Sequence, residues 1–414
     1  MSDSSGSSSA GLAPFRYRDF GIFQLSRSLI IIALEMQSVA IGWQIFATTK
    51  RALDLGLVGL AQFLPGILLF LISGHVADRF DRRKLLALCY AGFAVCSTLL
   101  LFIAWKHAAN IAAIYSVLVL LGVVRSFNGP VTRAVLPQLV PEEHFQSAVA
   151  WASTIFQGAT ILGPAIGGLA YGIFHGPDVV YALSMFAAVA ATTLALTIKA
   201  RQAERPREPA TLATFFVGVK YIWNKKLILG SISLDLFAVL LGGAVALLPV
   251  FAQDILRTGP LGLGFLRSAP AVGAAVMAIT LAYRPLRKRA GATMLWCVAA
   301  FGAFTILFGA SHSLTLSLLA LALVGATDMV SVVVRGTLIQ VATPDEMRGR
   351  VNAVDMIFIG ASNQLGQFES GVTAQWFGTV PAVILGGIGT IVVTGLWAWW
   401  FPELRNADQL VPKT

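Results

Sequence analysis

Charged residues are scarce in this sequence of 414 residues. Asp, Glu, Lys and Arg make up 12% of it, whereas 57% is hydrophobic, and the mean hydropathy is +0.77. A soluble domain carries about 25% charged residues, so too little polar surface remains here to cover a water-soluble globule. The composition excludes a soluble protein and indicates one that crosses a membrane many times.

Cysteine and histidine are rare too, with three and five copies. Cys89, Cys96 and Cys297 fall inside apolar stretches without C-x-x-C spacing, which argues against a disulfide framework or a metal clip. All five histidines fall in loops or at the ends of apolar stretches, so we expect no histidine relay. We expect no metal and no cofactor, and the sequence shows neither a nucleophile motif nor loops long enough for the catalytic domain of an enzyme.

Apolar stretches of roughly 20 residues, the length that a helix needs to cross a ~30 Å hydrocarbon core, recur along the chain. They do not alternate as the strands of a membrane β-barrel would. We therefore predict an all-α membrane protein with twelve transmembrane helices, near residues 20–45, 54–76, 85–105, 110–130, 147–174, 178–198, 227–251, 260–283, 291–311, 313–340, 351–377 and 380–402.

Polar segments divide the chain into parts. The polar segment at the N-terminus is followed by a full-length span without a cleavage site, so this segment is not expected to be a signal peptide. We predict a disordered cytoplasmic tail (1–19), an N-terminal six-helix half (20–198), a cytoplasmic linker (199–226), a C-terminal six-helix half (227–402) and a cytoplasmic tail (403–414). Within the linker, "LATFFVGVKYIW" predicts a helix on the membrane surface.

Lysine and arginine set the expected orientation, because they collect in cytoplasmic loops. Only Lys50, Arg51, Lys106 and Arg257 fall in the loops opposite the termini. Both termini are therefore predicted to be cytoplasmic. The formal charge of +10 follows mainly from this bias, and it does not require a nucleic-acid partner.

An internal repeat supports two equivalent halves. "VPEEHFQSAVA" (residues 140–150) aligns with "TPDEMRGRVNA" (residues 343–353) at an offset of 203 residues. The same offset pairs Gly168 with Gly371 and Phe174 with Phe377. A shared acidic loop followed by a shared glycine pattern indicates a parallel duplication of a six-helix unit.

The loop after the second span reads "GHVADRFDRRKLL" (residues 74–86) and resembles a signature of the major facilitator superfamily, G-x-L-A-D-R-x-G-R-R. Gly74, Ala77, Asp78, Arg79, Arg82 and Arg83 match, while Val76 and Asp81 replace Leu and Gly. The resemblance extends over all twelve spans. It implies that the loop, through Asp78 above all, is a conformational latch between the halves. A purely topological anchor is the alternative, and it accounts for the arginines but not for the aspartate.

Two further segments resemble signatures of the same superfamily. "LGVVRSFNGP" (121–130) is similar to the fourth-helix pattern of proton-coupled members and implies that Arg125 assists proton transfer or contacts substrate, a structural ion pair being the alternative. "GATILGPAIGGLAYG" (158–172) is similar to the fifth-helix antiporter pattern through Gly163, Pro164, Gly167 and Gly168. In the superfamily that pattern is found mainly in exporters, which implies outward transport.

Charged residues predicted inside spans are the candidate functional residues, because a charge in the membrane costs roughly 3 kcal/mol or more and usually has a partner or a function. They are Arg27, Glu35, Arg125, Asp235, Arg267, Asp328, Arg335 and Glu369. Helices 1, 4, 7 and 10, which line the central cavity in the superfamily, each carry at least one. The candidates for proton coupling are Glu35, Asp235, Asp328, Glu369 and Arg125, with structural ion pairs as the alternative. The candidates for the substrate cavity are Arg27, Glu35, Trp43, Arg125, Phe156, Asp235, Phe237, Asp328 and Arg335, with apolar packing as the alternative for the aromatic residues.

Within the superfamily the sequence most resembles the bacterial branch of enterobactin exporters and drug:proton antiporters. This resemblance implies a proton-coupled exporter of an amphiphilic organic molecule, such as a siderophore or a drug, working by alternating access. We expect a monomer in the bacterial inner membrane whose partners are a small organic substrate, protons and the lipid bilayer, with the proton gradient as energy source. The alternatives are a proton-coupled nutrient importer and a receptor or scaffold that does not transport.

Overall fold

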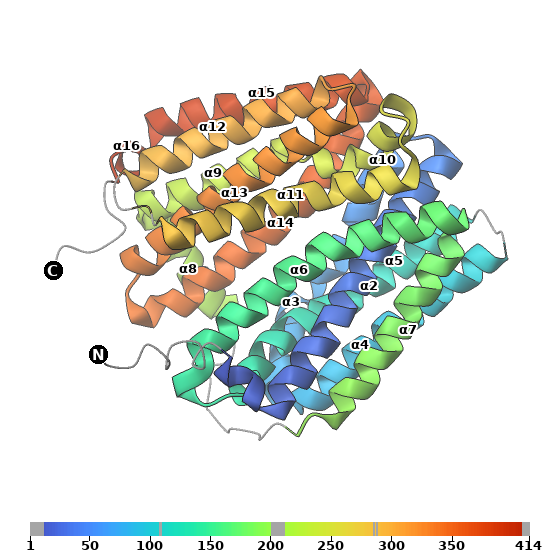
Figure 1. The fold of residues 1–414 in the computed structure, drawn as a ribbon. Coiled ribbons are helices and arrows are strands. Elements are labelled where there is room, and N and C mark those ends of the chain that lie inside the picture. Colours follow the sequence, from blue (N-terminus) through green and yellow to red (C-terminus); the bar gives the residue numbers. More distant parts are fainter. Residues whose placement is uncertain (1–11, 107–109, 200–211, 285, 287–288, 408–414) are drawn as a thin grey trace, which may run out of the picture. The chain divides into compact units, whose positions relative to one another are not determined.

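The computed structural model describes residues 12–106, 110–199, 212–284, 286 and 289–407. These residues form helices joined by short connections (Figure 1). The long helices of the first part are α2 (Arg18–Thr49), α3 (Ala52–Arg79), α4 (Arg82–Trp105), α5 (Ile111–Val135), α6 (Glu142–Phe174) and α7 (Pro177–Thr197). They are followed by α8 (Leu212–Asn224), α9 (Lys226–Gly242), α11 (Gly259–Tyr283), α12 (Ala290–Gly309), α13 (Leu314–Ala342), α14 (Asp345–Phe377) and α15 (Thr379–Trp400). Short elements complete the fold: η1 (Ala13–Arg16), η2 (Leu136–Gln138), η3 (Ala244–Leu247), α10 (Leu248–Val250), η4 (Phe251–Ile255) and α16 (Pro402–Arg405).

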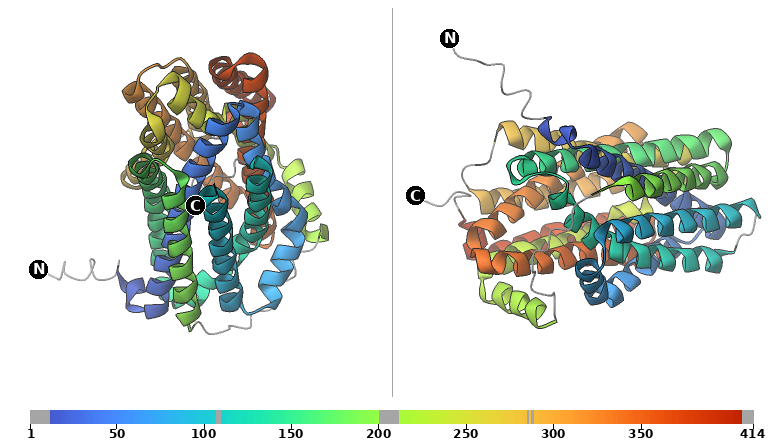
Figure 2. Two further views of the ribbon diagram at one scale, coloured as in Figure 1. Left: turned by 90° about the vertical axis from the view of Figure 1, so that its right-hand side faces the viewer. Right: turned by 90° about the horizontal axis from the view of Figure 1, so that it is seen from below.

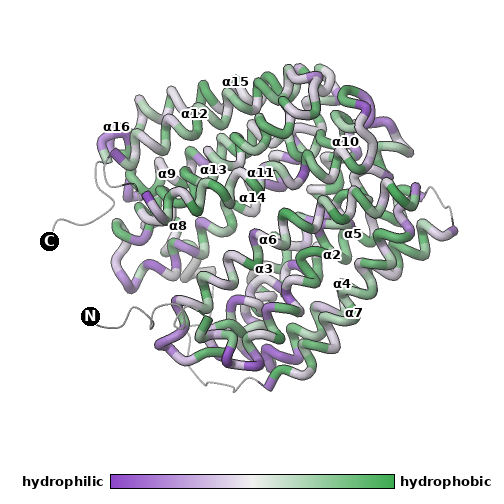
Figure 3. Tube along the Cα trace, in the orientation of Figure 1, coloured by the Kyte–Doolittle hydropathy of each residue, from purple (hydrophilic) through white to green (hydrophobic). Residues whose placement is uncertain are grey.

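The chain is an all-α membrane protein with twelve transmembrane helices in two six-helix halves. Eleven described segments are long and apolar enough to span a membrane by themselves, and α14 is the twelfth helix of spanning length. Hydrophobic residues run along the helices and hydrophilic residues gather at many of their ends (Figure 3). The predicted seventh span differs in one respect, because α9 ends at Gly242 and the rest of the span consists of η3, α10 and η4. The Gly243 carbonyl accepts a hydrogen bond from the Ser370 hydroxyl at this break.

The internal repeat is visible in the helix boundaries. Helices α6 and α14 each have 33 residues, and both ends of α14 lie 203 positions after the ends of α6. Each helix begins after a proline and carries two acidic residues in its first turn. Negative side chains are favourable there because the backbone amides at a helix start carry partial positive charge. The shared acidic segments therefore act as equivalent start signals for equivalent helices.

The described chain divides into two compact units. The first unit comprises Met1–Ile41 and Leu64–Ala210, and the second comprises Gly42–Phe63 and Thr211–Thr414. In the first, α4 packs against α5 and α7; in the second, α9 packs against α14 and α15, and α13 packs against α11 and α12. Figure 2 shows the long helices of each unit from two further sides. The second unit also holds the end of α2 and the start of α3. A Cβ atom on Gly56 of α3 would lie 3.1 Å from the Cα atom of Gly371 on α14, so these two helices touch through their backbones.

Some sequence predictions lie outside the described residues. They concern the tail over residues 1–11, most of the linker over residues 200–211 and the final residues 408–414. The side chain of Asp78 is also outside them, so its role as a latch stays a prediction.

Candidate functional site

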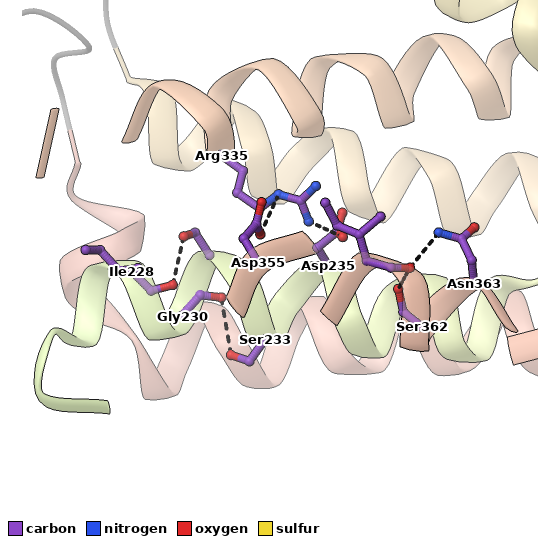
Figure 4. Close-up of polar contacts among 10 residues, drawn as sticks. Ile228, Gly230, Ser233, Asp235, Arg335, Asp355, Ser362 and Asn363 are labelled. Carbon is purple, nitrogen blue, oxygen red and sulfur yellow. Dashed lines mark hydrogen bonds and ion pairs between the residues drawn. The ribbon is translucent and has the colours of Figure 1, made fainter. Parts of the chain in front are cut away.

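A buried cluster of charged side chains lies where α9, α13 and α14 meet. Arg335 of α13 pairs through Nη1 with the Oδ2 atom of Asp235 on α9. Its Nε atom lies 3.7 Å from the Oδ1 atom of Asp355 on α14. Figure 4 shows the guanidinium group of Arg335 between the two carboxylates. Only 3% of Arg335 and 5% of Asp235 is exposed. Buried ion pairs therefore connect the three helices.

A third carboxyl group belongs to the same cluster. Asp328 lies seven residues before Arg335, about two turns along α13, and therefore on the same face of that helix. It interacts electrostatically with both Arg335 and Asp235. Taking charges out of water is costly, and the cost is recovered only where opposite charges are paired. This cluster sets three carboxyl groups against one guanidinium group, so negative charge is in excess when all of them are ionised.

The cluster opens on a cavity of about 230 Å³ inside the second unit. Polar groups come from Asp235, Asp328 and Arg335 and from Asn363 and Gln367 of α14. Apolar lining residues include Val239 of α9, Pro270 of α11, Phe301 and Phe308 of α12 and Val324 of α13. Ligand pockets for drug-sized molecules measure about 300–1,000 Å³. The cavity is therefore suited to one chemical group of such a molecule, with apolar walls and a charged end.

Helix α14 tolerates its polar residues because backbone carbonyls satisfy several of them. The amide of Asn363 and the hydroxyl of Ser362 both donate to the carbonyl oxygen of Ile359, at 2.8 and 3.0 Å (Figure 4). Thr373 donates to the Oε1 atom of Glu369 at 2.6 Å. Polar groups in a membrane must be satisfied internally. These local bonds let α14 remain a continuous helix while Asn363 and Gln367 face the cavity.

Asp355 is the site residue that the sequence analysis missed. It lies five residues into the predicted eleventh span but is not among the charged residues that the sequence analysis places inside spans. The structure places its side chain, which is 14% exposed, beside Arg335. One available signal was the location of Arg335 inside an apolar span, since a charge in the membrane usually has a partner. The sequence did not say which neighbour provides it.

In the first unit, Arg27 of α2 has neutral partners. Its Nη1 atom donates to the carbonyl oxygen of Ala152 on α6 at 3.2 Å, and its guanidinium carbon lies 5.6 Å from the centre of the Phe156 ring. A cation over an aromatic face is attracted by the ring's negative face. Two predicted cavity residues, Arg27 and Phe156, are thus brought together.

The remaining candidates are dispersed. Glu35 and Arg125 are half-buried on α2 and α5 of the first unit. Glu369 is half-buried on α14, where it accepts the hydroxyl of Thr373 rather than joining the cluster around Arg335. Among the aromatic residues, the backbone of Trp43 accepts from Gln253, and Phe237 packs against Trp397 with ring centres 5.3 Å apart. Neither Trp43 nor Phe237 lines the cavity described above, and Arg267 is half-buried on α11.

The charged loop between α3 and α4 forms hydrogen bonds with nearby helix ends in the first unit. Asp81 caps α4 by accepting from the backbone amides of Arg83 and Lys84, which accounts for an acidic residue where the superfamily usually has glycine. Arg82 donates to the carbonyl of Ala134 in the last turn of α5, and Arg83 donates to the carbonyl of Ile198, the residue that follows α7. Cations are favourable at helix C-termini, where carbonyls lack partners. The loop therefore connects three helix ends. Of the other residues that match the superfamily signature, Gly74 is half-buried and Arg79 is exposed.

The glycines of the predicted antiporter pattern place α6 directly against α2. A Cβ atom on Gly163 would lie 2.5 Å from the Cβ atom of Glu35, and one on Gly167 would lie 2.7 Å from the Cα atom of Met36. Pro164 and Gly168 are buried beside them. Larger side chains at the two glycines would force the helices apart. The pattern thus brings Glu35, a predicted proton-coupling residue, against the proline-containing turn of α6.

Each unit consists of long apolar helices with charged side chains inside it, and the second unit holds a cavity with a charged end, as expected of a membrane transporter of the major facilitator superfamily. The family model described as "transmembrane secretion effector" matches residues 9–413. The chain belongs to that family. It is not an enzyme, since the family and its relatives are transporters.

Curated relatives and solved structures agree with this assignment. The chain is 27% identical over 401 residues to the enterobactin exporter EntS of Shigella boydii serotype 4 and to that of an Escherichia coli O1:K1 strain, covering 94% of this chain and 93% of each relative. Its fold is similar to a D-xylose–proton symporter, with a TM-score of 0.71, 13% identity and coverage of 94% and 99% of the two chains. It is also similar to an inward-facing bacterial homologue of the iron transporter ferroportin, with a TM-score of 0.71, 15% identity and coverage of 94% and 98%. These two similarities concern the fold alone.

Proposed function

We propose that this transporter is a proton-coupled exporter of an amphiphilic organic molecule of the siderophore or drug type. The observation that carries the proposal is the cluster in which Arg335 is held by Asp235 and Asp355 while Asp328 borders the same cavity. In this proposal the protein is an antiporter in the bacterial inner membrane with both termini in the cytoplasm, and it works by alternating access as a monomer.

The excess of carboxyl groups suggests how protons and substrate compete. With every group ionised, the cluster carries more negative than positive charge in a place from which water is largely excluded. Binding of one proton reduces that excess, and so does binding of a positively charged or hydrogen-bond-donating group of a substrate in the cavity. Two ligands that relieve the same excess of charge displace one another. This competition is what antiport requires, because one ligand must leave before the other is carried back.

Outward direction is supported by two observations of different kinds. The Gly163 and Gly167 contacts place α2 against α6 through the pattern that resembles exporters, and the curated relatives reported above are named as enterobactin exporters. A nutrient importer is the second candidate, since the fold is also that of a D-xylose–proton symporter. A scaffold that does not transport would have no use for a buried excess of carboxyl groups.

The test is transport of enterobactin into inside-out membrane vesicles containing the full chain. With the lumen acidic, we expect enterobactin to accumulate inside as protons leave, and collapse of the gradient with an ionophore to stop it. The Asp235→Asn variant should lose the dependence on the gradient while reaching the membrane in normal amounts. The matched control is Asp254→Asn, because Asp254 is half-exposed and pairs with Lys50 outside the cluster.

Three results would count against the proposal. Accumulation that ignores the gradient would remove proton coupling. Accumulation only in right-side-out vesicles would favour the importer. Absence of both transport and binding for enterobactin and for a panel of lipophilic drugs would favour the scaffold.

A further inference from the structure

One surface of the second unit is not used by the proposed transport site: the outward face of α8. Trp223 is 71% exposed and Phe216 is 62% exposed. With Lys220, which is also exposed, they follow the i, i+4, i+7 spacing that places side chains on one side of a helix. Two more exposed lysines, Lys225 and Lys226, come directly after the helix. Phe216, Lys220 and Trp223 on this side of the helix, with Lys225 and Lys226 directly after its end, are called the α8 face below. The α8 face combines large apolar rings with positive charge.

The opposite side of α8 is firmly packed. A Cβ atom on Gly218 would lie 2.9 Å from the carbonyl oxygen of Arg350, so α8 rests directly on the backbone of α14. The hydroxyl of Tyr221 donates to the carbonyl of Ala342 at the end of α13. Ile222 is buried in an apolar cluster with residues of α9, α13 and α14. These contacts fix the orientation of α8. They also determine that the rings of Phe216 and Trp223 are directed outward.

The connection to α9 indicates the level of α8 relative to the membrane. Helix α8 ends at Asn224, and the membrane-spanning segment Lys226–Ile255 begins two residues later. The α8 face is thus at the level where the chain enters the bilayer. Tryptophan is favoured at that level, lysine stems reach from it to phosphate groups, and amphipathic helices with such faces lie in the interfacial plane.

We propose that the α8 face is a docking surface for anionic phospholipids. Trp223 and Phe216 insert between headgroups, and the three lysines bind phosphate groups and the negative charge of the lipid. The sequence of α8 and the two lysines after it contains no acidic residue, so this face repels none of that charge. The partner is a lipid surface rather than a protein because the face continues directly into a transmembrane helix.

The location of α8 gives this docking a consequence, which rests on the proposed function. Gly218 also approaches the side chain of Val354, next to Asp355 in the sequence. A lipid-held α8 therefore steadies the turn of α14 that carries Asp355 beside Arg335. In this way the charge of the surrounding lipid regulates the cluster from outside the cavity.

The test uses fluorescence of the full chain in nanodiscs and does not depend on transport. The difference in emission between the chain and its Trp223→Leu variant isolates Trp223 from the other tryptophans. A minor fraction of brominated phosphatidylglycerol, or in a parallel sample brominated phosphatidylcholine, is placed in otherwise identical discs of zwitterionic lipid. We expect both lipids to quench Trp223 and the anionic one to quench it several-fold more, because each lysine near the surface adds about a fivefold preference for anionic lipid.

Two charge variants complete the experiment. Replacing Lys220, Lys225 and Lys226 together by glutamine should remove the excess quenching by the anionic lipid and leave quenching by the zwitterionic one. Replacing Arg16, Arg18 and Lys84 by glutamine removes the same charge from exposed positions of the first unit and should leave the excess in place. Absence of quenching by either lipid would overturn the docking. Equal quenching by both lipids, or an excess that survives loss of the three lysines, would overturn the recognition of anionic headgroups. None of these outcomes bears on proton coupling, so the two proposals fail separately.

Discussion

The two units stabilise an arginine inside them with different partners. Arg27 in the first unit binds a backbone carbonyl and an aromatic ring, whereas Arg335 in the second is held by two carboxylates. The partner positions correspond, because Ala152 on α6 and Asp355 on α14 are separated by the repeat offset of 203. A carbonyl or a ring keeps the same charge at every pH of interest, but a carboxylate can take up a proton. At equivalent positions of the repeat, Arg335 thus has a protonatable partner where Arg27 has a backbone carbonyl.

The largest expected effect separates the two arginines by stability. Arg335→Met leaves buried carboxylates without their cation, and breaking a buried pair in this way costs about 3–5 kcal/mol. Arg27→Met removes a hydrogen bond to a neutral carbonyl and a ring contact, for which we expect about 1–2 kcal/mol. Thermal unfolding of the two variants in the same detergent measures the difference.

A rescue experiment checks the cause of that difference. Adding Asp235→Asn to Arg335→Met should recover part of the lost stability, since it removes one of the uncompensated charges. If the double variant were less stable than Arg335→Met alone, the cost would come from packing, and the contrast between the two arginines would lose its electrostatic basis.

A second prediction concerns the scaffold that the halves share. Gly163 of α6 and Gly366 of α14 are separated by the repeat offset, and each lets its helix approach a neighbour: a Cβ atom would lie 2.5 Å from the Cβ of Glu35 in one case and 2.9 Å from the carbonyl oxygen of Val239 in the other. Alanine at either position should destabilise the protein by about 1–3 kcal/mol through overpacking. Gly158→Ala is the control, because open space surrounds that position. A large loss at one glycine and none at the other would show that the helix contacts have diverged as much as the charges have.

Much of this architecture was accessible from the sequence, and the reason is physical. Helix number and the equivalence of α6 and α14 follow from hydrophobic length and from acidic start signals, which are local properties. The burial of Asp235 and Arg335 was predicted from their location within apolar stretches. Their pairing depends on which helices are neighbours, and the third partner, Asp355, was missed because its depth along α14 is set by packing rather than by composition. The carbonyl of Gly243, where α9 breaks, likewise accepts a hydrogen bond from a distant residue, Ser370.

The smallest expected effect comes from copying the carboxylate of the second unit into the first. Ala152→Asp places an acid at the repeat equivalent of Asp355, on the α6 residue whose carbonyl already accepts from Arg27. Ala152 is 4% exposed, so the larger side chain carries an overpacking cost at every pH. The ionised form pairs with Arg27 and the protonated form does not. An aspartate in the unfolded chain takes up a proton only at about pH 4, so the contribution of this pairing is present at pH 6 and lost at pH 3. The stability of the variant relative to the parent should therefore be greater at pH 6 than at pH 3, by on the order of 1 kcal/mol. Ala152→Asn has nearly the same shape and no titratable proton, so its stability relative to the parent should be the same at both pH values. An equal pH response in the two variants would mean that Arg27 does not reach the new carboxylate, and that its neutral environment depends on more of α6 than a single position.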